Sequence, residues 1–172
     1  MDSIELGNFN IDKLDLVKID ESKRLPIRAF AKTLDIYEDA NYPVIYAELR
    51  LLDGSELKTE FPIIGEEYID LEFSSPKLNN PLKLKLYISH ISSDNHVNDR
   101  GKIYTLQLTS LEYLNNQEGQ FSRKYKDMNE QIVKKILQEN LRTKKDIFLE
   151  ETRGITEILI TLQHPLEAID ML

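Results

Sequence analysis

The chain has 172 residues, of which 41% are hydrophobic, and it carries a net charge of −8 at pH 7 with no cysteine. This length and composition predict a globular protein, and the absence of thiols excludes disulfides, thiol catalysis and cysteine-based zinc sites. No apolar run approaches the roughly 20 residues of a membrane-spanning helix, and the first residues do not resemble a signal peptide. We therefore expect a soluble protein that is made inside a cell.

Period-2 alternation of apolar and polar residues predicts β-strands through the first two thirds of the chain. The predicted strands cover residues 14–19, 27–38, 45–51, 68–73, 82–89 and 104–108. The alternation slips at Lys32-Thr33, where we expect a bulge, and Asp53-Gly54-Ser55 is expected to turn the chain. Strands that follow one another without intervening helices favour an antiparallel sheet curled into a barrel or a sandwich.

The pattern changes over residues 108–120, and a helix is predicted after it. Its apolar stripe consists of Met128, Ile132, Val133, Ile136, Leu137 and Leu141. Asp127 is expected to cap this helix with Glu130 as the reciprocating residue, and Glu130 is expected to form an i,i+4 pair with Lys134.

The end of the chain returns to β-character. Residues 146–151 and 156–162 are predicted to form a hairpin that turns at Thr152-Arg153-Gly154. Pro165 then opens a helix in whose first turn its missing N–H costs little. No glycine, asparagine or basic last turn closes that helix, so we expect the chain to be the N-terminal part of a longer polypeptide.

The acidic excess lies in residues 1–120, which carry 13 lysines and arginines against 21 aspartates and glutamates. Proteins that grip nucleic acid use basic surfaces, because contacts with phosphates supply most of their non-specific affinity. The composition therefore argues against nucleic-acid binding, and the acidity is most simply a means of keeping the protein soluble.

The histidines offer one candidate metal site. His90, Asp94 and His96 lie close together in the sequence and could in principle hold a divalent ion. The polar stretch 92–101 is more simply a solvated hairpin loop, and His164 before Pro165 is more simply a residue at the entry to a helix. We therefore predict no metal ligands and no bound cofactor.

Neighbouring carboxylates could suggest acid–base catalysis by a hydrolase. The pairs are Glu66-Glu67, Asp70 with Glu72, and Glu150-Glu151. Successive residues of a strand point to opposite faces, so Glu66-Glu67 is a poor pair, and Asp70 and Glu72 are expected on a wet face. No nucleophile elbow, glycine-rich phosphate loop or zinc-protease motif is present in the sequence. We therefore predict no catalytic residues and expect that the protein is not an enzyme.

Two basic groups complete the candidate residues. Arg123-Lys124-Tyr125-Lys126 could dock a phosphate or stack on a base, but a solvated approach loop or a protein contact is the simpler interpretation. Lys83 and Lys85 are interpreted as protection of an edge strand or as an intersubunit contact.

Six short segments follow one another in a distinctive order. They are Phe61–Phe73, Tyr104–Ser110, Phe121–Tyr125, Ile132–Leu137, Glu150–Gly154 and Pro165–Ile169. Together they resemble the N-terminal region of the baseplate hub proteins of contractile-tailed bacteriophages, which are related to the hub domains of type VI secretion spikes. The resemblance covers roughly residues 25–172 and rests on order and spacing, since no single segment is diagnostic.

The resemblance implies an α+β fold that is mostly β. Residues 1–110 would form an antiparallel, tail-tube-like β-barrel, and residues 111–172 a helix-containing segment with a β-hairpin that leads into a second, incomplete barrel domain. It also implies a structural virion protein, a central hub subunit that trimerises into a pseudo-hexameric ring. The family carries no catalytic residues in this region, so none is transferred.

In such a ring the partners are other copies of the chain, the spike protein, and tail-tube or tube-initiator proteins. DNA would pass through the lumen without specific binding, and an acidic lumen would repel its phosphates. The resemblance implies no insertion into a membrane. It places the protein in the tail baseplate of the virion, and in the host cytoplasm during assembly.

Three alternatives remain open. A hexameric tail-tube or tube-initiator protein would be built from a similar barrel. A soluble β-rich ligand-binding module would need an apolar pocket with exposed aromatic residues. A hydrolase would need a pair of carboxylates held across a groove.

Overall fold

The computed structural model describes residues 9–39, 42–54, 57–76, 80–98 and 101–172. The chain divides into two compact units, Met1–Ser110 and Leu111–Leu172. Antiparallel strands dominate and the helices are few and short, which confirms the predicted mostly-β class. None of the described helices is long and apolar enough to cross a membrane. The interpretation of the two units as one barrel and the beginning of a second stays a prediction.

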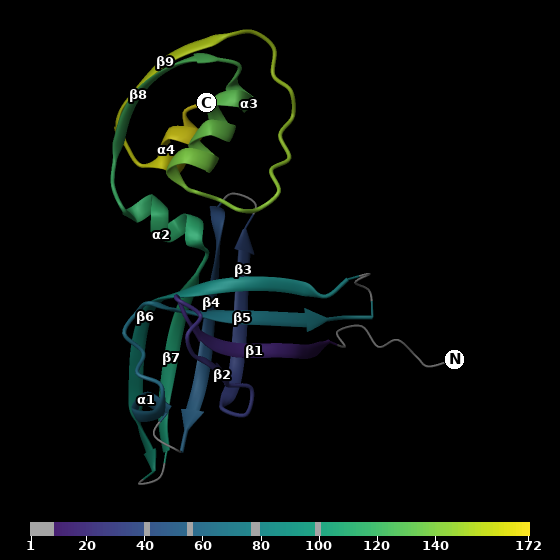
Figure 1. The fold of residues 1–172 in the computed structure, drawn as a ribbon, viewed down its shortest axis with the longest axis vertical. Helices are drawn as coiled ribbons and strands as arrows, with labels where there is room; N and C mark the ends of the chain where they lie inside the picture. The colour runs from purple at the N-terminus through teal and green to yellow at the C-terminus, as the bar shows by residue number, and fades with distance from the viewer. Residues whose placement is uncertain (1–8, 40–41, 55–56, 77–79, 99–100) are drawn as a thin grey trace. The chain divides into compact units, whose positions relative to one another are not determined.

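In the described part of the first unit, seven strands form one antiparallel sheet in the order β2-β1-β5-β6-β7-β4-β3. The elements are β1 (Asn10–Lys18), β2 (Arg24–Pro26), β3 (Ala31–Asp39), β4 (Tyr42–Asp53), α1 (Leu57–Glu60), β5 (Glu67–Ser74), β6 (Leu82–Asn98) and β7 (Gly101–Thr109). Figure 1 shows β1 and β5 crossing β4 and β7 at a steep angle, so the sheet folds over itself into two layers.

Strand β6 belongs to both layers. Its first half pairs with β5, where Leu84 lies opposite Leu71, and its second half pairs with β7, where Ile91 lies opposite Leu106. The register of the β6–β7 pair shifts between Ile88 and His90, and such a bulge bends a strand. Residues 92–98 therefore continue β6 as a strand, and the polar loop predicted over residues 92–101 is wrong for these residues, while residues 99–100 lie outside the described part of the chain. Backbone pairing with β7 outweighs the turn preference of these polar side chains.

The two outermost strands of the sheet, β2 and β3, are consecutive in the chain. Ile27 N donates to Leu14 O in β1 at 2.9 Å, and Leu52 N in β4 donates to Phe30 O at 2.8 Å. Residues 27–30 therefore bridge the two ends of the sheet order, as in a sheet that curls toward a barrel. They also interrupt the single strand predicted over residues 27–38. The bulge predicted at Lys32-Thr33 is confirmed, because the register shifts between Ala31 and Thr33.

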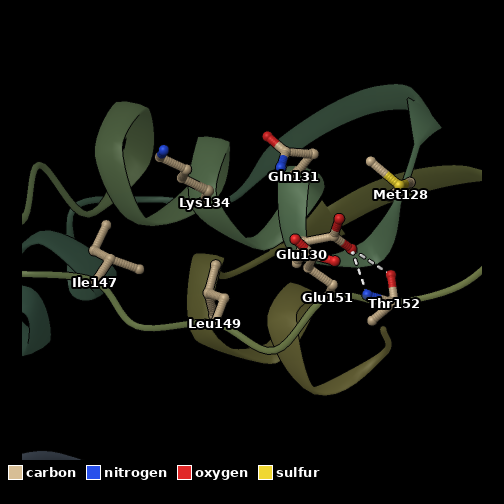
Figure 2. Close-up of a pocket in the computed structure, with 8 residues that line it drawn as sticks. All are labelled: Met128, Glu130, Gln131, Lys134, Ile147, Leu149, Glu151 and Thr152. Atoms are coloured by element: carbon tan, nitrogen blue, oxygen red, sulfur yellow. Dashed lines mark hydrogen bonds between the residues drawn. The ribbon is translucent and has the colours of Figure 1, made fainter.

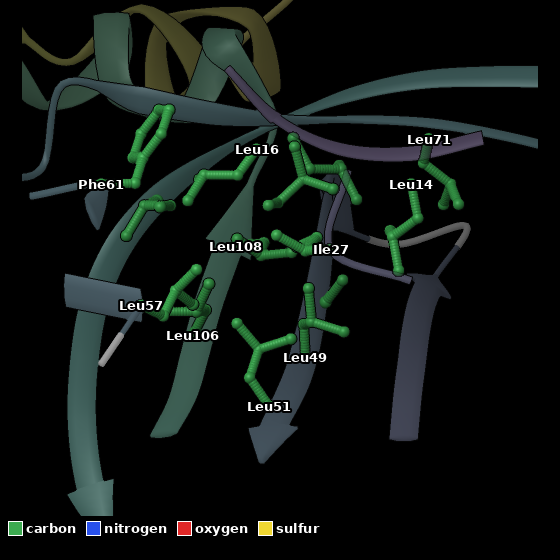
Figure 3. Packing of buried hydrophobic residues seen from close by; sticks show 14 residues of the cluster. Leu14, Leu16, Ile27, Leu49, Leu51, Leu57, Phe61, Leu71, Leu106 and Leu108 are labelled. Atoms are coloured by element: carbon green, nitrogen blue, oxygen red, sulfur yellow. The ribbon is translucent and has the colours of Figure 1, made fainter. Parts of the chain in front are cut away.

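The core of the first unit lies between the two layers. It consists of Leu14, Leu16, Ile27, Ala47, Leu49, Leu51, Leu57, Phe61, Ile69, Leu71, Leu86, Ile88, Leu106 and Leu108. Figure 3 shows Leu16 and Leu108 pointing into the same space between the layers, with Leu57 and Phe61 at one side. Most of these side chains come from the predicted strands, whereas Leu57 and Phe61 lie on and directly after α1, outside any predicted strand. Burial of each large side chain contributes about 1.5–3 kcal/mol.

The second unit combines a two-stranded ribbon with short helices. Its elements are α2 (Leu111–Gln117), β8 (Phe121–Asp127), α3 (Asn129–Lys135) with a π-helical turn η1 (Ile136–Asn140), β9 (Thr156–Gln163) and α4 (Pro165–Asp170). The ribbon of β8 and β9 curls around α3 and α4 in Figure 1. Tyr125, Ile160, Ile132, Ile136 and Ala168 form its buried core.

The curl of the ribbon has a local cause in β9. Leu162 adopts a left-handed backbone conformation with φ of 48°, and its N–H donates to Ser122 Oγ at 2.9 Å. The register between the strands shifts at this point, from Phe121 opposite Gln163 to Arg123 opposite Ile160. An extra residue of this kind increases the twist and bends the strand.

Two predictions for the second unit are wrong. Residues 146–151 form no strand, and β9 pairs instead with β8, for which a solvated approach loop or a protein contact was predicted. Residues 156–162 do form a strand, as predicted. Phe121 and Tyr125 give β8 its apolar face, and packing of that face on the helices decides which segments pair.

The helix prediction is confirmed for most of its stripe and wrong in its cap. Ile132, Ile136 and Leu141 are fully buried, whereas Met128 precedes the helix and is exposed. Asp127 is the last residue of β8, however, and the N-cap position falls on Met128, which has no side chain able to cap. Asp127 binds Lys135 Nζ at 2.8 Å instead. Helix α4 begins at Pro165 as expected, and the N-cap His164 is closed by Glu167.

Candidate interaction surfaces

The corner before β5 is organised by a buried carboxylate. The side chain of Glu67 is 0% exposed, and it accepts hydrogen bonds from Ile64 N at 3.1 Å, Gly65 N at 3.0 Å and Lys18 Nζ at 3.1 Å. Gly65 has φ of 95°, a conformation that glycine adopts without strain. Glu66 is exposed. The pair Glu66-Glu67 is therefore one structural carboxylate and one solvated one, and the two do not form an acid–base pair.

The outward face of β1, β2 and β5 carries a network of ion pairs. Lys13 Nζ donates to Asp70 Oδ2 at 2.6 Å, and Arg24 Nη1 donates to both Asp15 Oδ2 and Asp70 Oδ2 at 2.9 Å. Burial raises the pKa of Asp70, but the hydrogen bonds from Lys13 and Arg24 outweigh burial and hold the pKa below its usual value. Asp70 is thus committed to a structural contact.

This network predicts a loss of stability in acid. The folded-state pKa of Asp70 is lowered, so its contribution is complete above the unfolded pKa of about 3.9 and is lost as the pH falls through the folded pKa. We expect Asp70→Asn to lower the free energy of unfolding by about 1 kcal/mol at pH 7, since Arg24 and Lys13 are partly exposed. Urea unfolding at pH 7 and at pH 2–3, about one unit below the unfolded pKa, measures the difference.

The matched control for Asp70→Asn is Asp35→Asn, at an exposed position of β3. It is expected to change stability by less than about 0.5 kcal/mol at either pH. A difference between wild type and Asp70→Asn that does not shrink in acid would contradict the assignment.

Glu72, the other β5 carboxylate of the candidate acid–base pair, lies close to a lysine. Glu72 lies 3.4 Å from Lys83 Nζ, and Lys85 Nζ lies 3.5 Å from Glu21 and 4.9 Å from the ring centre of Tyr68. Lys83 and Lys85 lie in the first half of β6, which pairs only with β5 among the described strands, so their interpretation as protection of an edge strand or as an intersubunit contact stays a prediction. Both lysines lie close to carboxylates of the first unit.

The histidine candidates do not form a site among the described side chains. His90 lies exposed on β6, opposite Gln107. The side chains of Asp94 and His96 lie outside the described residues. Elsewhere, no group of three or more potential metal ligands gathers in the described part of the chain. His164 is occupied by its Nδ1 contact with Asn116 O at 2.8 Å.

The basic cluster lies on β8 and its cations have partners within the unit. Arg123 binds Glu139, while Lys124 and Lys126 both bind Glu157 on the adjacent strand. These pairs are largely exposed, and exposed pairs are worth little and exchange partners readily. The cluster therefore lies on a strand, so the predicted approach loop is wrong, and the other interpretation, a protein contact, stays a prediction.

Residues 141–155, which we call the strap, connect η1 to β9 without regular secondary structure. Glu112 on α2 holds the beginning of the strap, because its two oxygens accept hydrogen bonds from Thr143 Oγ1 at 2.7 Å and Lys145 Nζ at 2.8 Å. Burial raises the pKa of Glu112, but these two contacts outweigh burial and lower the pKa. Glu130 on α3 holds the end of the strap by accepting hydrogen bonds from Thr152 N and Thr152 Oγ1.

Between its two anchors the strap stands off from the helix. A cavity of about 430 Å³ lies there, and its lining residues are Met128, Glu130, Gln131, Lys134, Ile147, Leu149, Glu151 and Thr152. Figure 2 shows Ile147 and Leu149 on the strap and Lys134 on α3, with the Glu130–Thr152 contact closing one end. The predicted pair of Glu130 with Lys134 is thus replaced by a tertiary contact. Phe148, between Ile147 and Leu149, is 92% exposed.

The end anchor of the strap depends on the ionised form of Glu130. The hydrogen bond from the Thr152 side chain is the main cause that lowers the pKa of Glu130. The contact is therefore complete above the unfolded pKa of about 4.3 and is lost as the pH falls through the lowered folded pKa. We expect the NMR signal of the Thr152 amide to shift over that acid range, and to lie near its low-pH position in Glu130→Gln at pH 7.

Glu151→Gln is the control for this titration, since Glu151 is exposed. The Thr152 amide is expected to titrate in this variant as in the wild type. An unchanged acid shift in Glu130→Gln would show that another group controls the strap.

Helix α2 gathers polar contacts that sequence reasoning missed. Asn115 Nδ2 donates to Leu141 O at 2.7 Å, and Asn116 Oδ1 accepts from Leu166 N at 2.9 Å. Both asparagines are buried, and together with Glu112 they tie the helix end, the strap and the start of α4 to one element. Nothing in the spacing of Glu112, Asn115 and Asn116 distinguishes them from solvated residues, so no sequence signal could have found them.

The first unit also contains an apolar groove. It has a volume of about 520 Å³ and is lined by Phe9, Ile11, Leu14, Arg28, Ala31, Lys32, Thr33, Leu34, Ile36, Leu71 and Phe73. Phe9 is 67% exposed and Ile36 is 37% exposed. The groove is the feature that a β-rich binding module would need.

Comparison with known proteins gives matches of structure only. No protein-family model matches the chain, and no curated protein matches it by sequence. The Escherichia coli c3393 protein matches 94% of the chain with a TM-score of 0.52 and 12% identity. It is a component of the type VI secretion system with structural similarity to the T4 bacteriophage tail proteins gp27 and gp5.

A second match is a phage protein. Prophage tail protein gp18 from Listeria monocytogenes matches 93% of the chain with a TM-score of 0.57 and 8% identity. The fold is shared with phage tail and type VI secretion proteins. This confirms, for the fold, the resemblance predicted from the six sequence segments. The chain spans 41% of the c3393 protein and 44% of gp18.

Proposed function

We propose that this chain is a structural component of a phage tail, and that it forms part of the central hub of a baseplate. The observation that supports this function is the shared fold. A phage tail protein covers 93% of the chain in the structural comparison, and a type VI secretion component covers 94%. Fold alone does not determine function. The order of the six sequence segments, which resembles the hub family, is the second and independent support.

In the proposed hub, three copies form a pseudo-hexameric ring that joins the tail tube to the spike. The protein then resides in the baseplate of the virion, and in the host cytoplasm before assembly. DNA passes through the ring without specific binding, in keeping with the net charge of −8. We expect no retardation of linear DNA by the protein at physiological salt.

The proposal includes no enzymatic activity. Glu67, Asp70 and Glu72, the acids flagged in the first unit, each hold a lysine, an arginine or backbone N–H groups. A catalytic carboxylate needs instead to face a groove with a perturbed pKa suited to proton transfer. These contacts support a structural role for the acids.

Stoichiometry tests the proposed function. Light scattering of the purified chain, with negative-stain images of the same sample, should give threefold rings. Sixfold rings would point to a tail-tube or tube-initiator protein instead. A strict monomer that binds a fluorescent fatty acid in the groove near Phe9 and Phe73 would favour the ligand-binding module.

A further inference from the structure

The strap contains a segment that has the character of a β-strand but lacks a partner strand. In residues 146–151, Ile147 and Leu149 line the cavity beside α3, while Phe148 is 92% exposed, so the side chains alternate as in a strand. None of the hydrogen bonds between described residues involves the backbone of residues 146–151. Unpaired N–H and C=O groups of this kind can pair with another chain when the segment adopts a strand conformation.

The ribbon has unpaired strand edges. In the described residues β8 and β9 pair only with each other, so each has one edge without a neighbouring strand. A ribbon of two strands is marginally stable unless it packs against further structure or gains a strand. The side chains of Arg123, Lys124 and Lys126 on β8 are 51%, 63% and 69% exposed. An added strand would therefore meet a basic surface at β8.

The charges of the strap complement those of β8. Asp146, Glu150 and Glu151 are all exposed, and none of the ion pairs between described residues includes them. The partners that now hold the β8 cations, Glu139 and Glu157, do so in exposed pairs. Such pairs cost little to rearrange, so the strap acids can share or replace them.

The two surfaces lie on opposite flanks of the second unit. Figure 1 shows α3 and α4 between the ribbon on one side and the strap on the other. A contact between two different surfaces is heterologous, and repetition of it from copy to copy closes into a ring when the rotation permits. A contact of strap to ribbon would propagate in this way.

We propose that residues 146–151 of one copy add as a strand to the free edge of β8 in a second copy, with the acids of the strap against Arg123, Lys124 and Lys126. Strand addition of this kind takes its affinity from main-chain hydrogen bonds and its specificity from side chains. That repeated contacts of this kind close into a ring rests on the proposed hub function. The contact makes the strap and the free edge of β8 the subunit interface.

Engineered disulfides test the contact, because the chain has no native cysteine. Lys124→Cys combined with Glu150→Cys is expected to give intermolecular disulfides on mild oxidation, visible as multimers on a non-reducing gel. The control combines Lys124→Cys with Glu48→Cys, at an exposed position of β4, and is expected to stay uncrosslinked. Cross-linking by Glu150→Cys alone would overturn the proposal, since it would place two straps together.

Two further results separate this contact from the proposed function. Rings that form without the Lys124–Glu150 cross-link would overturn the strap contact and leave the hub function standing. A chain that stays monomeric at every concentration would overturn both. Hydrogen exchange adds a direct readout: the amides of residues 146–151 should exchange at least about tenfold more slowly in the assembled form, as paired strand amides do. Unchanged exchange in assembled protein would overturn strand addition.

Charge reversal tests the electrostatic part. Asp146→Lys with Glu150→Lys, two acids on the same face of the added strand, is expected to weaken assembly about tenfold or more, because like charges then face each other across the contact. Addition of Lys124→Glu and Lys126→Glu to the same chain should restore it. Circular dichroism of each variant checks that the fold is retained. A failure of the reversed pair to restore assembly, in folded protein, would overturn the proposed partner surface.

Discussion

Glu67→Ala is expected to lower the free energy of unfolding of the first unit by about 3 kcal/mol. The carboxylate is fully buried and accepts hydrogen bonds from Ile64 N and Gly65 N. Alanine would leave these two N–H groups without an acceptor, and Lys18 without its counter-ion. The loss should appear in urea unfolding at pH 7 as a lower midpoint with an unchanged slope.

Glu66→Ala is the matched control, because Glu66 is the exposed neighbour on the same corner. We expect it to change stability by less than about 0.5 kcal/mol. Glu67→Gln keeps one acceptor oxygen and should lose about half as much as alanine. Equal effects of the alanine variants at both positions would show that the carboxylate does not organise the corner.

Ile132→Ala is expected to unfold the second unit while the first stays folded. Ile132 is 0% exposed at the centre of a small core that includes Tyr125, Ile136 and Ile160. Truncation of a buried isoleucine costs about 2–5 kcal/mol. A small unit has little stability in reserve. Hydrogen exchange should show fast amides throughout β8 and β9, with unchanged protection in β5 and β7.

Leu159→Ala is the control for this variant, since Leu159 lies on the same ribbon and is 65% exposed. Its exchange pattern should match that of the wild type. Loss of protection in β5 and β7 together with β8 and β9 would show that the two units unfold as one.

The first unit could be predicted largely from alternation, and the reason is burial. In β4, Ala47, Leu49 and Leu51 face a core sealed by two layers, so each inward position needs an apolar side chain. The same demand extends through β5 and β7. The polar end of β6 was not predicted as a strand. Its backbone pairs with β7, and such pairing does not require the alternating apolar residues on which the prediction relied.

The second unit was harder to predict, because two segments compete for one partner. Residues 146–151 contain the apolar run Ile147-Phe148-Leu149, yet only β8 has Phe121 and Tyr125 placed to pack on the helices. Local pattern cannot report which of two candidate strands lies beside β9. The contacts of Glu130 with Thr152 and of Asn115 with Leu141 join residues 22 and 26 positions apart, beyond the reach of any spacing rule.

The strand order of the first unit also sets the sequence of events during synthesis. Strand β1 leaves the ribosome before its partner β5, which follows roughly 50 residues later. At about 5–20 residues per second, β1 waits about 3–10 s for that partner. During this interval Leu14 and Leu16 have no core to enter. The nascent chain therefore passes through a period in which a chaperone would protect it from aggregation.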